Sequence, residues 1–182
     1  MPAESAGEKT NRKNNGSDLI SLKLYNYFMG EFKPKRGSGD LGYTDIFLKR
    51  VPKTHLVIKL NALLDELGAV IGVLRSGNKK LNKELLDIQK GLIALSSFLA
   101  GYGKKEEVAR LTLGLEKAVS SGSVNFKIKK FAVFGENRFP ASLNLIRAKT
   151  RICEIMAWQA KSAPAARYLN RLSDYLFLLS VR

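Results

Sequence analysis

LNALLDELGAVIGVL, residues 60–74, places its apolar side chains at a regular helical spacing. Steps of four, three, four and three residues separate Leu60, Leu64, Leu67, Ile71 and Leu74. This spacing lines one face of an amphipathic α-helix. We therefore predict a helix that starts near Val57 and ends at the SGN sequence of residues 76–78.

Similar stripes recur along the rest of the chain. A second helix is predicted up to GYG at 101–103, a third up to SSGS at 120–123, and a fourth from about Pro140 to about Ser162. Pro164 separates the fourth helix from a fifth. The stripe residues are Leu81, Leu85, Ile88, Leu92, Leu95 and Leu99, then Val108, Leu111, Leu115 and Ala118, and finally Tyr168, Leu172, Tyr175 and Leu179. Such stripes joined by short glycine-containing loops predict an all-α fold, a five-helix antiparallel bundle.

The remaining segments define the domain organisation. Residues 1–17 are polar and rich in Gly, Asn and Lys, so we predict a disordered basic tail ahead of one helical-bundle domain at 18–182. Residues 18–34 are ambiguous, with a short aromatic-bearing helix as one interpretation. Residues 38–52 are predicted to be the main irregular segment. Residues 124–134 alternate and are rich in β-branched side chains, which favours an extended loop.

Composition narrows the function classes. The 182 residues include one cysteine and one histidine, and their net charge is +15. A single cysteine excludes an internal disulfide and favours a reducing, cytoplasmic location. A single histidine, His55, excludes multi-histidine metal sites, and we interpret it as a surface residue at a helix start. No apolar run is long enough to span a membrane, and no secretory signal is present at the start.

The positive charge leaves three partners open: nucleic acid, a membrane surface, or a polyanionic small ligand such as a nucleotide triphosphate. The basic residues are spread over many short clusters. No basic stripe with interleaved aromatics and no zinc or basic-zipper signature supports a specific nucleic-acid reader. A binder of DNA or RNA is therefore the less favoured hypothesis.

Residues 36–45, RGSGDLGYTD, raise the possibility of a phosphate-binding loop. Three glycines let backbone amides turn toward an anion, and basic side chains flank them. Neither GxxxxGK[ST] nor a GxGxxG after a strand is present. From this motif alone an ordinary loop is the favoured interpretation.

Several polar residues are not required by a packed bundle. Asp65 lies in the middle of the first predicted helix, where Asp has poor helix propensity. Arg147 and Arg151 share a face of the fourth helix, with Glu154 three residues further on. Asn170 and Asp174 lie in the fifth. Each residue has an alternative interpretation as an exposed charge, but together they place both charge signs on three helices.

These residues resemble a known family. The sequences SGDLGYTD, LLDELGAVIG, FAVFG, LIRAKTRICE and LNRLSDYLFLL occur in the order and spacing of the PduO-type ATP:cob(I)alamin adenosyltransferases, over about residues 38–182. NRLSDYLF together with the upstream DEL is specific, whereas GDxGxT alone is weak. The resemblance implies a five-helix bundle that assembles as a homotrimer with sites between subunits. It also implies ATP, Mg²⁺ and cobalamin as ligands, with cobalamin as the substrate that accepts the 5′-deoxyadenosyl group of ATP.

The resemblance assigns roles residue by residue. It places the loop around the ATP triphosphate at Ser38, Gly39, Asp40, Gly42 and Thr44, and the later ATP-binding lysine at Lys53. Arg147 and Arg151 match the first two arginines of the family's RxxxRRxE pattern and are candidate catalytic residues, with Asp65 and Phe131. Glu154 matches the acid of that pattern, and Asn170 matches the asparagine that contacts the nucleotide. Asp65 matches the aspartate that pairs with the counterpart of Arg147 across the subunit boundary. Phe131 matches the aromatic residue beside the corrin that displaces the lower axial ligand.

Two departures from the family pattern bear on activity. Ile152 replaces the second arginine of the RR pair, and Lys59 reverses the charge of an acidic position. These changes are compatible with a divergent enzyme, or with a catalytically degenerate bundle that binds nucleotide or corrin or serves in an assembly. Retention of Asp65, Phe131, Arg147, Arg151 and Asn170 favours the enzyme.

Overall fold

The structure, a computed structural model, describes residues 39–47, 49–77, 79–124 and 132–181. The predicted tail at 1–17, the ambiguous segment 18–34, Ser38 and Phe131 lie outside the described residues. Two strands, β1 (Tyr43–Ile46) and β2 (Lys49–Pro52), precede the helices. The described helices are α2 (Leu56–Ser76), α3 (Asn82–Leu99), α4 (Lys105–Ser123), α5 (Arg138–Gln159) and α6 (Ala163–Val181).

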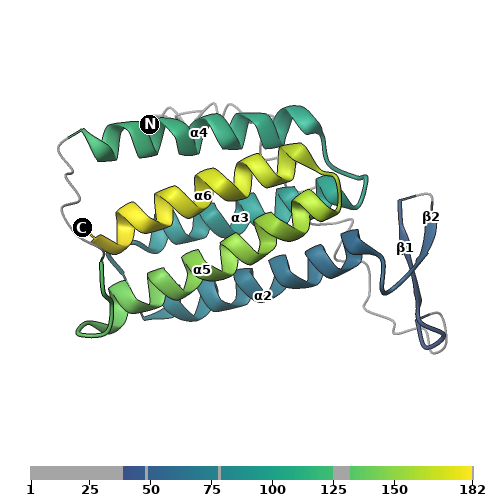
Figure 1. Ribbon diagram of the computed structural model, residues 1–182, viewed down its shortest axis with the longest axis horizontal. Coiled ribbons are helices and arrows are strands. Elements are labelled where there is room, and N and C mark those ends of the chain that lie inside the picture. The colour runs from purple at the N-terminus through teal and green to yellow at the C-terminus, as the bar shows by residue number, and fades with distance from the viewer. Residues whose placement is uncertain (1–38, 48, 78, 125–131, 182) are drawn as a thin grey trace, which may run out of the picture. The chain divides into compact units, whose positions relative to one another are not determined.

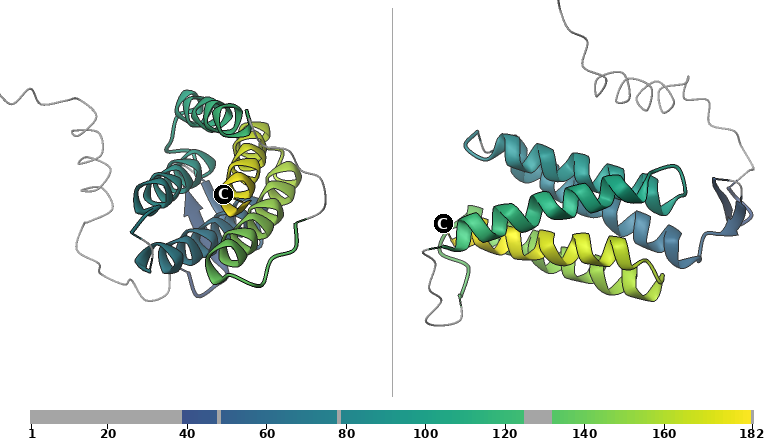
Figure 2. Two further views of the ribbon diagram at one scale, coloured as in Figure 1. Left: turned by 90° about the vertical axis from the view of Figure 1, so that its left-hand side faces the viewer. Right: turned by 90° about the horizontal axis from the view of Figure 1, so that it is seen from above.

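The five described helices form a ring in the order α2, α3, α4, α6, α5, in which each helix packs against the next and α5 returns to α2 (Figure 2). Successive helices run in opposite directions, as the predicted antiparallel bundle requires (Figure 1). One pair of helices that are adjacent in the ring is parallel instead. α6 packs against both α4 and α5, and α4 and α6 run in the same direction because α5 separates them in the sequence. The predicted all-α bundle is confirmed.

The predicted leucine stripes form the core of this ring. Leu60, Leu64, Leu67 and Ile71 of α2 are buried, as are Leu85, Leu92 and Leu95 of α3 and Leu169, Leu172 and Leu176 of α6. The hydrophobic effect favours the bundle because each stripe is removed from water only when the neighbouring helices cover it. Tyr168 reaches from α6 across the core to Gly91 of α3.

Residues 39–52 are more regular than the predicted irregular segment. β1 and β2 pair as an antiparallel hairpin, with Tyr43 opposite Pro52 and Ile46 opposite Lys49. Tyr43, Thr44, Ile46 and Val51 favour strands, but each strand has only four residues, and the chain leaves β1 through Phe47 with a φ of +42°. A hairpin usually turns on Asn or Gly, so the turn signal was missing from the sequence.

Helix ends differ from the prediction by up to one turn. α4 continues through the SSGS sequence to Ser123. α5 starts at Arg138, where the side chain of Asn137 accepts a hydrogen bond from the Phe139 amide, and Pro140 lies inside its first turn. Pro164 lies inside the first turn of α6, and residues 132–135 form neither helix nor strand.

Within the described residues, no helix combines the length and apolarity needed to cross a bilayer.

Candidate functional site

The β1–β2 hairpin brings the glycine-bearing segment and Lys53 together. The Lys53 amide donates to the Gly42 carbonyl at 2.7 Å, which extends the strand ladder by one pair. Gly42 has a φ of +79°, a value that glycine adopts without strain. The ammonium of Lys53 lies beside Gly39, where an added Cβ would sit 3.2 Å from Nζ. We call residues 39–42 the glycine loop.

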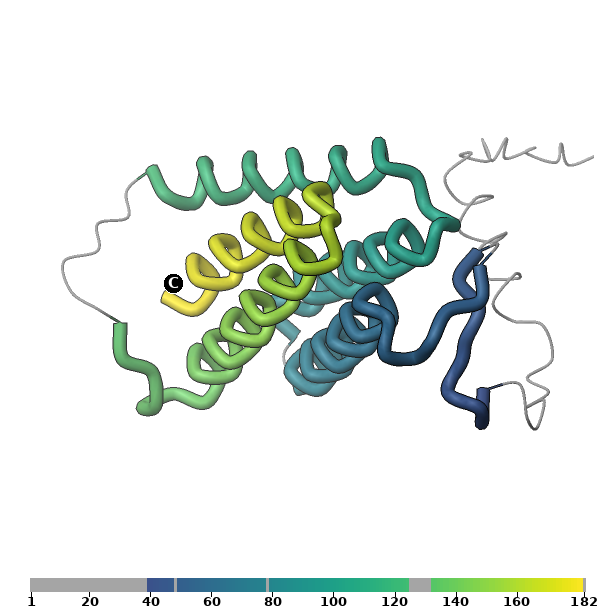
Figure 3. The backbone as a smooth tube through the Cα atoms, turned by 45° about the vertical axis from the view of Figure 1, so that its right-hand side comes forward, coloured from purple at the N-terminus to yellow at the C-terminus, as the bar shows by residue number. Residues whose placement is uncertain are grey.

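The position of the glycine loop follows from the hairpin. The hairpin extends from the end of the bundle at which α2 begins (Figure 3). Asp40 is exposed and Thr44 is half-buried in β1. The hairpin is what brings Lys53 next to the glycine loop and Thr44. No dedicated phosphate-loop motif is involved.

A second group lines a cavity of about 330 Å³ among α4, α5 and α6. Arg147 and Arg151 come from α5, one helical turn apart as their spacing predicted. We call this space the arginine cavity; its lining is Val119, Ser123, Arg147, Arg151, Ser173, Asp174, Phe177 and Leu178. Sequence analysis had not selected the α4 residues, because their helical stripe gives no sign that α4 borders α6 at this point.

The connection between α5 and α6 sets which residues face each other in the arginine cavity. It contains three residues, and the Ser162 amide donates to the Ala157 carbonyl at 2.9 Å while Lys161 takes a φ of +56°. This is the hydrogen-bond pattern of a Schellman helix end. The two helices therefore turn back on each other, and Arg151 comes to border the same cavity as Ser173 and Asp174.

The arginine cavity has more positive than negative charge. Asp174 pairs with Arg171 at 3.4 Å. Nε of Arg147 donates to Oδ1 of Asn144 at 2.9 Å, which orients its guanidinium without neutralising it. Among the described residues neither Arg147 nor Arg151 has a carboxylate ion-pair partner. Two unneutralised guanidiniums on one wall suit the oxygens of a phosphate or carboxylate, which they can bind bidentately.

Glu154 and Asn170 are not part of the lining of the arginine cavity. Both are half-buried, and each lies one turn nearer the α5–α6 connection than Arg151 and Asp174, respectively. Because α5 and α6 are antiparallel, Glu154 and Asn170 lie at a similar level along the two helices. The structure brings four of the predicted residues to this stretch of the α5–α6 pair: Arg147, Arg151, Glu154 and Asn170.

Asp65 lies elsewhere in the chain. It is exposed on α2 and has no ion-pair partner among the described residues. The next residue, Glu66, forms a salt bridge with Lys149 of α5, in which Nζ of Lys149 donates a hydrogen bond to Oε1 of Glu66 at 2.6 Å. Because adjacent residues point about 100° apart around a helix, Glu66 joins α2 to α5 and Asp65 does not.

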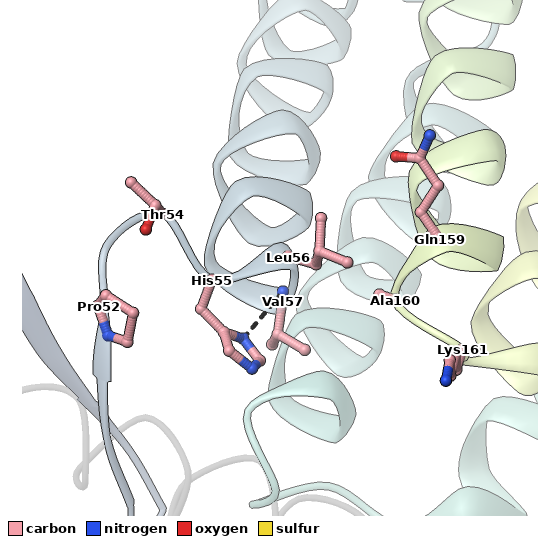
Figure 4. Close-up of a pocket in the computed structure, with 8 residues that line it drawn as sticks. All are labelled: Pro52, Thr54, His55, Leu56, Val57, Gln159, Ala160 and Lys161. Atoms are coloured by element: carbon pink, nitrogen blue, oxygen red, sulfur yellow. Dashed lines mark hydrogen bonds between the residues drawn. The ribbon is translucent and has the colours of Figure 1, made fainter.

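The only histidine occupies a separate cavity of about 430 Å³, between the start of α2 and the α5–α6 connection (Figure 4). Nδ1 of His55 accepts from the Val57 amide at 3.3 Å, so the side chain caps α2. This confirms the interpretation of His55 as a surface residue at a helix start. In the described part of the chain, no group of three His, Cys, Asp or Glu side chains is placed to hold a metal ion.

Comparison with known proteins identifies relatives of this chain. The family description "Cobalamin adenosyltransferase" matches residues 35–182. The corrinoid adenosyltransferase of Bacillus subtilis is 29% identical over 159 residues, covering 77% of this chain and 80% of its own length. The corrinoid adenosyltransferase PduO of Citrobacter freundii is 30% identical over 161 residues, and the match spans 47% of that protein.

A solved structure has a similar fold. A variant of the PduO-type ATP:corrinoid adenosyltransferase from Lactobacillus reuteri, complexed with cobalamin and ATP, superposes with a TM-score of 0.71 at 25% identity. The superposition covers 81% of this chain and 91% of that one.

Proposed function

The chain belongs to the cobalamin adenosyltransferase family, and on this basis we propose that it transfers the 5′-deoxyadenosyl group of ATP to cob(I)alamin, forming adenosylcobalamin. The observation that carries the proposal is the arginine cavity. Arg147 and Arg151 lie one helical turn apart on its wall, and among the described residues of a single chain no carboxylate pairs with either of them.

The reaction needs electrostatic positioning rather than a protein nucleophile. The reduced cobalt supplies an electron pair to C5′ of ATP, the Co–C bond forms, and the C5′–O bond breaks as triphosphate leaves with its electrons. The leaving triphosphate carries most of the negative charge. Fixed cations beside it stabilise the transition state and hold ATP in line for attack. A chain with one capping histidine and one buried cysteine can therefore perform it.

We assign the residues accordingly. The glycine loop, Thr44 and Lys53 bind the triphosphate together with Arg151, while Glu154 and Asn170 contact the nucleotide. Arg147 is assigned to the pair with Asp65 of a second copy. Mg²⁺ is expected to arrive with ATP, because it is usually held by phosphate oxygens and only one or two carboxylates. Ser38 and Phe131, outside the described residues, complete the proposal: Ser38 in the loop, and Phe131 as an apolar wall against the corrin that excludes water from the cobalt.

The same proposal includes a homotrimer with sites shared between subunits. Leu145, Ile152 and Ile155 lie on the outer face of α5 and are 53%, 54% and 58% exposed. Exposed apolar side chains along one helix face are a common feature of protein interfaces. Asp65 and Arg147, each without an ion-pair partner in the described chain, are the complementary charges that a second copy would join. The single, buried cysteine supports a cytoplasmic location.

A spectroscopic transfer assay tests the function. The full chain is supplied with MgATP and chemically reduced cobalamin, and formation of the Co–C bond is followed by absorbance. Arg151→Ala is expected to lower kcat/KM by about 100-fold or more, because it removes one fixed cation at the leaving group. Arg110→Ala, an exposed arginine outside the cavity on α4, is the matched control and should leave the rate unchanged.

A catalytically degenerate bundle is the second candidate, favoured by Ile152. An exposed apolar side chain stands there on α5, where the family pattern has a second arginine. Absence of product from a folded, assembled chain with verified cob(I)alamin would reject the transferase. In that case, ATP binding that is weakened in Arg151→Ala would identify the chain as a nucleotide-binding relative.

A further inference from the structure

The geometry of the glycine loop depends on the hairpin that carries it. Gly42 directly precedes β1 and Lys53 directly follows β2, so both arms move with the strands. Within the two strands only Val51 is buried, at 8% exposure. A two-stranded hairpin is marginally stable by itself. Its orientation on the bundle therefore requires a contact outside the strands.

Such a contact lies at the far end of the hairpin, about 13 Å from the glycine loop at roughly 3.3 Å per strand residue. The ring of Phe47 meets that of Tyr102 edge-on, with centroids 5.5 Å apart and an interplanar angle of 88°. Tyr102 belongs to the connection between α3 and α4. Its neighbour Gly101 has a φ of +89°, and a Cβ there would lie 3.0 Å from Cβ of Phe47. Phe47 of the hairpin thus contacts both the ring of Tyr102 and the backbone at Gly101.

Phe47 is an unusual residue for this place. Its φ of +42° lies in the left-handed region, which bulky side chains seldom adopt. Glycine or asparagine would meet the turn at lower conformational cost. Phe47 is 55% and Tyr102 49% exposed, so burial alone does not account for an aromatic residue here. The edge-to-face contact is the feature that a phenylalanine supplies and a glycine does not.

We propose that the Phe47–Tyr102 contact is a positioning contact for ATP: it docks the hairpin so that the glycine loop and Lys53 meet the triphosphate. This rests on the proposed function. When the contact is lost, the hairpin populates orientations that do not bind ATP, and the apparent affinity falls by the fraction still docked. Neither aromatic residue touches the reacting atoms, so the chemical step itself is unaffected.

Replacement of Phe47 by glycine separates the ring from the turn. Phe47→Gly keeps the positive φ at no steric cost and removes the whole benzyl side chain. The Kd and the KM for MgATP are expected to rise about three- to tenfold, the range of an aromatic pair, with kcat at saturating ATP unchanged. Phe47→Tyr should retain wild-type values, and Tyr102→Leu should match Phe47→Gly. The double variant should be no worse than either single one. Wild-type affinity in Phe47→Gly would overturn the proposal.

Amide hydrogen exchange gives a readout that does not need ATP. In the full-length chain without ligand, the paired amides of β1 and β2 should exchange faster in Phe47→Gly than in the wild type, while the helices stay protected. Leu113→Ala, an exposed position on α4, is the control and should change neither exchange nor ATP binding. Unchanged exchange of the hairpin would refute the positioning role. Failure of the wild type to bind ATP, with exchange altered as expected, would instead count against the proposed function.

Discussion

Arg147 and Lys149 show how two neighbouring cations of one helix differ in role. Lys149 pairs with Glu66 of α2 and so contributes to packing between helices. Arg147 is oriented by Asn144, an amide that leaves its charge intact. A spacing of four residues fixes a shared helix face, which is why sequence analysis could place Arg147 and Arg151 together, and both line the arginine cavity. Sequence analysis could not tell that Glu66 would serve the bundle and Asp65 would not.

Cys153 is expected to be an inert thiol with a measurable effect at high pH. Burial, and secondarily the nearby charge of Glu66, raises its pKa from 9.0 to about 11. Between these two values the unfolded chain has lost the thiol proton and the folded chain has kept it. Stability therefore falls as pH rises from about 9 to 11, by about 2–3 kcal/mol for this group.

Chemical denaturation at pH 8 and pH 10.5 measures this loss. Cys153→Ala should lose less stability than the wild type over the same interval, since its side chain does not titrate. Tyr168, whose pKa is also raised by burial, is present in both proteins and cancels in the comparison. Equal losses in the two proteins would contradict the assignment, as would rapid labelling of the native thiol at pH 8.

At the scale of elements, the helices were predictable and the hairpin was not. α2, α3, α4 and α6 each carry an apolar stripe over about three to five turns, a long signal that tertiary contacts reinforce. The hairpin has four residues in each strand and turns on a phenylalanine, so its conformation depends on Gly101 and Tyr102, more than fifty residues away. Such long-range contacts leave no trace in local sequence.

The packing of α3 against α6 depends on Gly91, because a Cβ there would overlap the hydroxyl of buried Tyr168. Gly91→Ala is expected to destabilise the chain by about 1–3 kcal/mol through this overlap, although alanine is the better helix former. Adding Tyr168→Phe removes the nearest atom and should recover part of the loss. Urea denaturation of the single and double variants measures both effects.

Gly114 of α4 provides the matched control, since nothing lies within 4 Å of the Cβ that alanine would add. Gly114→Ala should stabilise the chain by up to about 1 kcal/mol, the propensity difference alone. If Gly91→Ala also proved stabilising, close packing between α3 and α6 at this point would be refuted.

For the whole molecule, one chain holds two separate parts of the proposed site. The glycine loop and Lys53 lie at the hairpin, Arg147 and Arg151 lie in the middle of α5, and Asp65 is exposed on α2. The family resemblance implies sites between subunits, and among the described residues of one chain the arginine cavity is lined by Arg147 and Arg151 but not by Lys53 or Asp65. The pattern of a single sequence cannot give the position of a neighbouring copy, so this part of the site was beyond it.

Assembly is tested at the outer face of α5. The wild type is expected to sediment as a trimer of about 61 kDa, three times the 20.2 kDa of the chain. Ile155→Glu places a charge on the exposed apolar face and should lower this mass, because a buried unpaired charge is costly at an interface. Leu113→Glu, at a similarly exposed position on α4, is the control. A monomeric wild type, or a trimeric Ile155→Glu, would contradict the proposed interface.

The place of α6 between α4 and α5 also constrains how the chain folds. During synthesis α2, α3 and α4 leave the ribosome before α6 is made. The apolar face of α4 that packs against α6 therefore stays uncovered until α6, about forty residues or more further along the chain, has been synthesised. Distant contacts of this kind form late and slowly. The rate-limiting step is therefore expected to be docking of α6, and the species that accumulates before it exposes α4 and is the one at risk of aggregation.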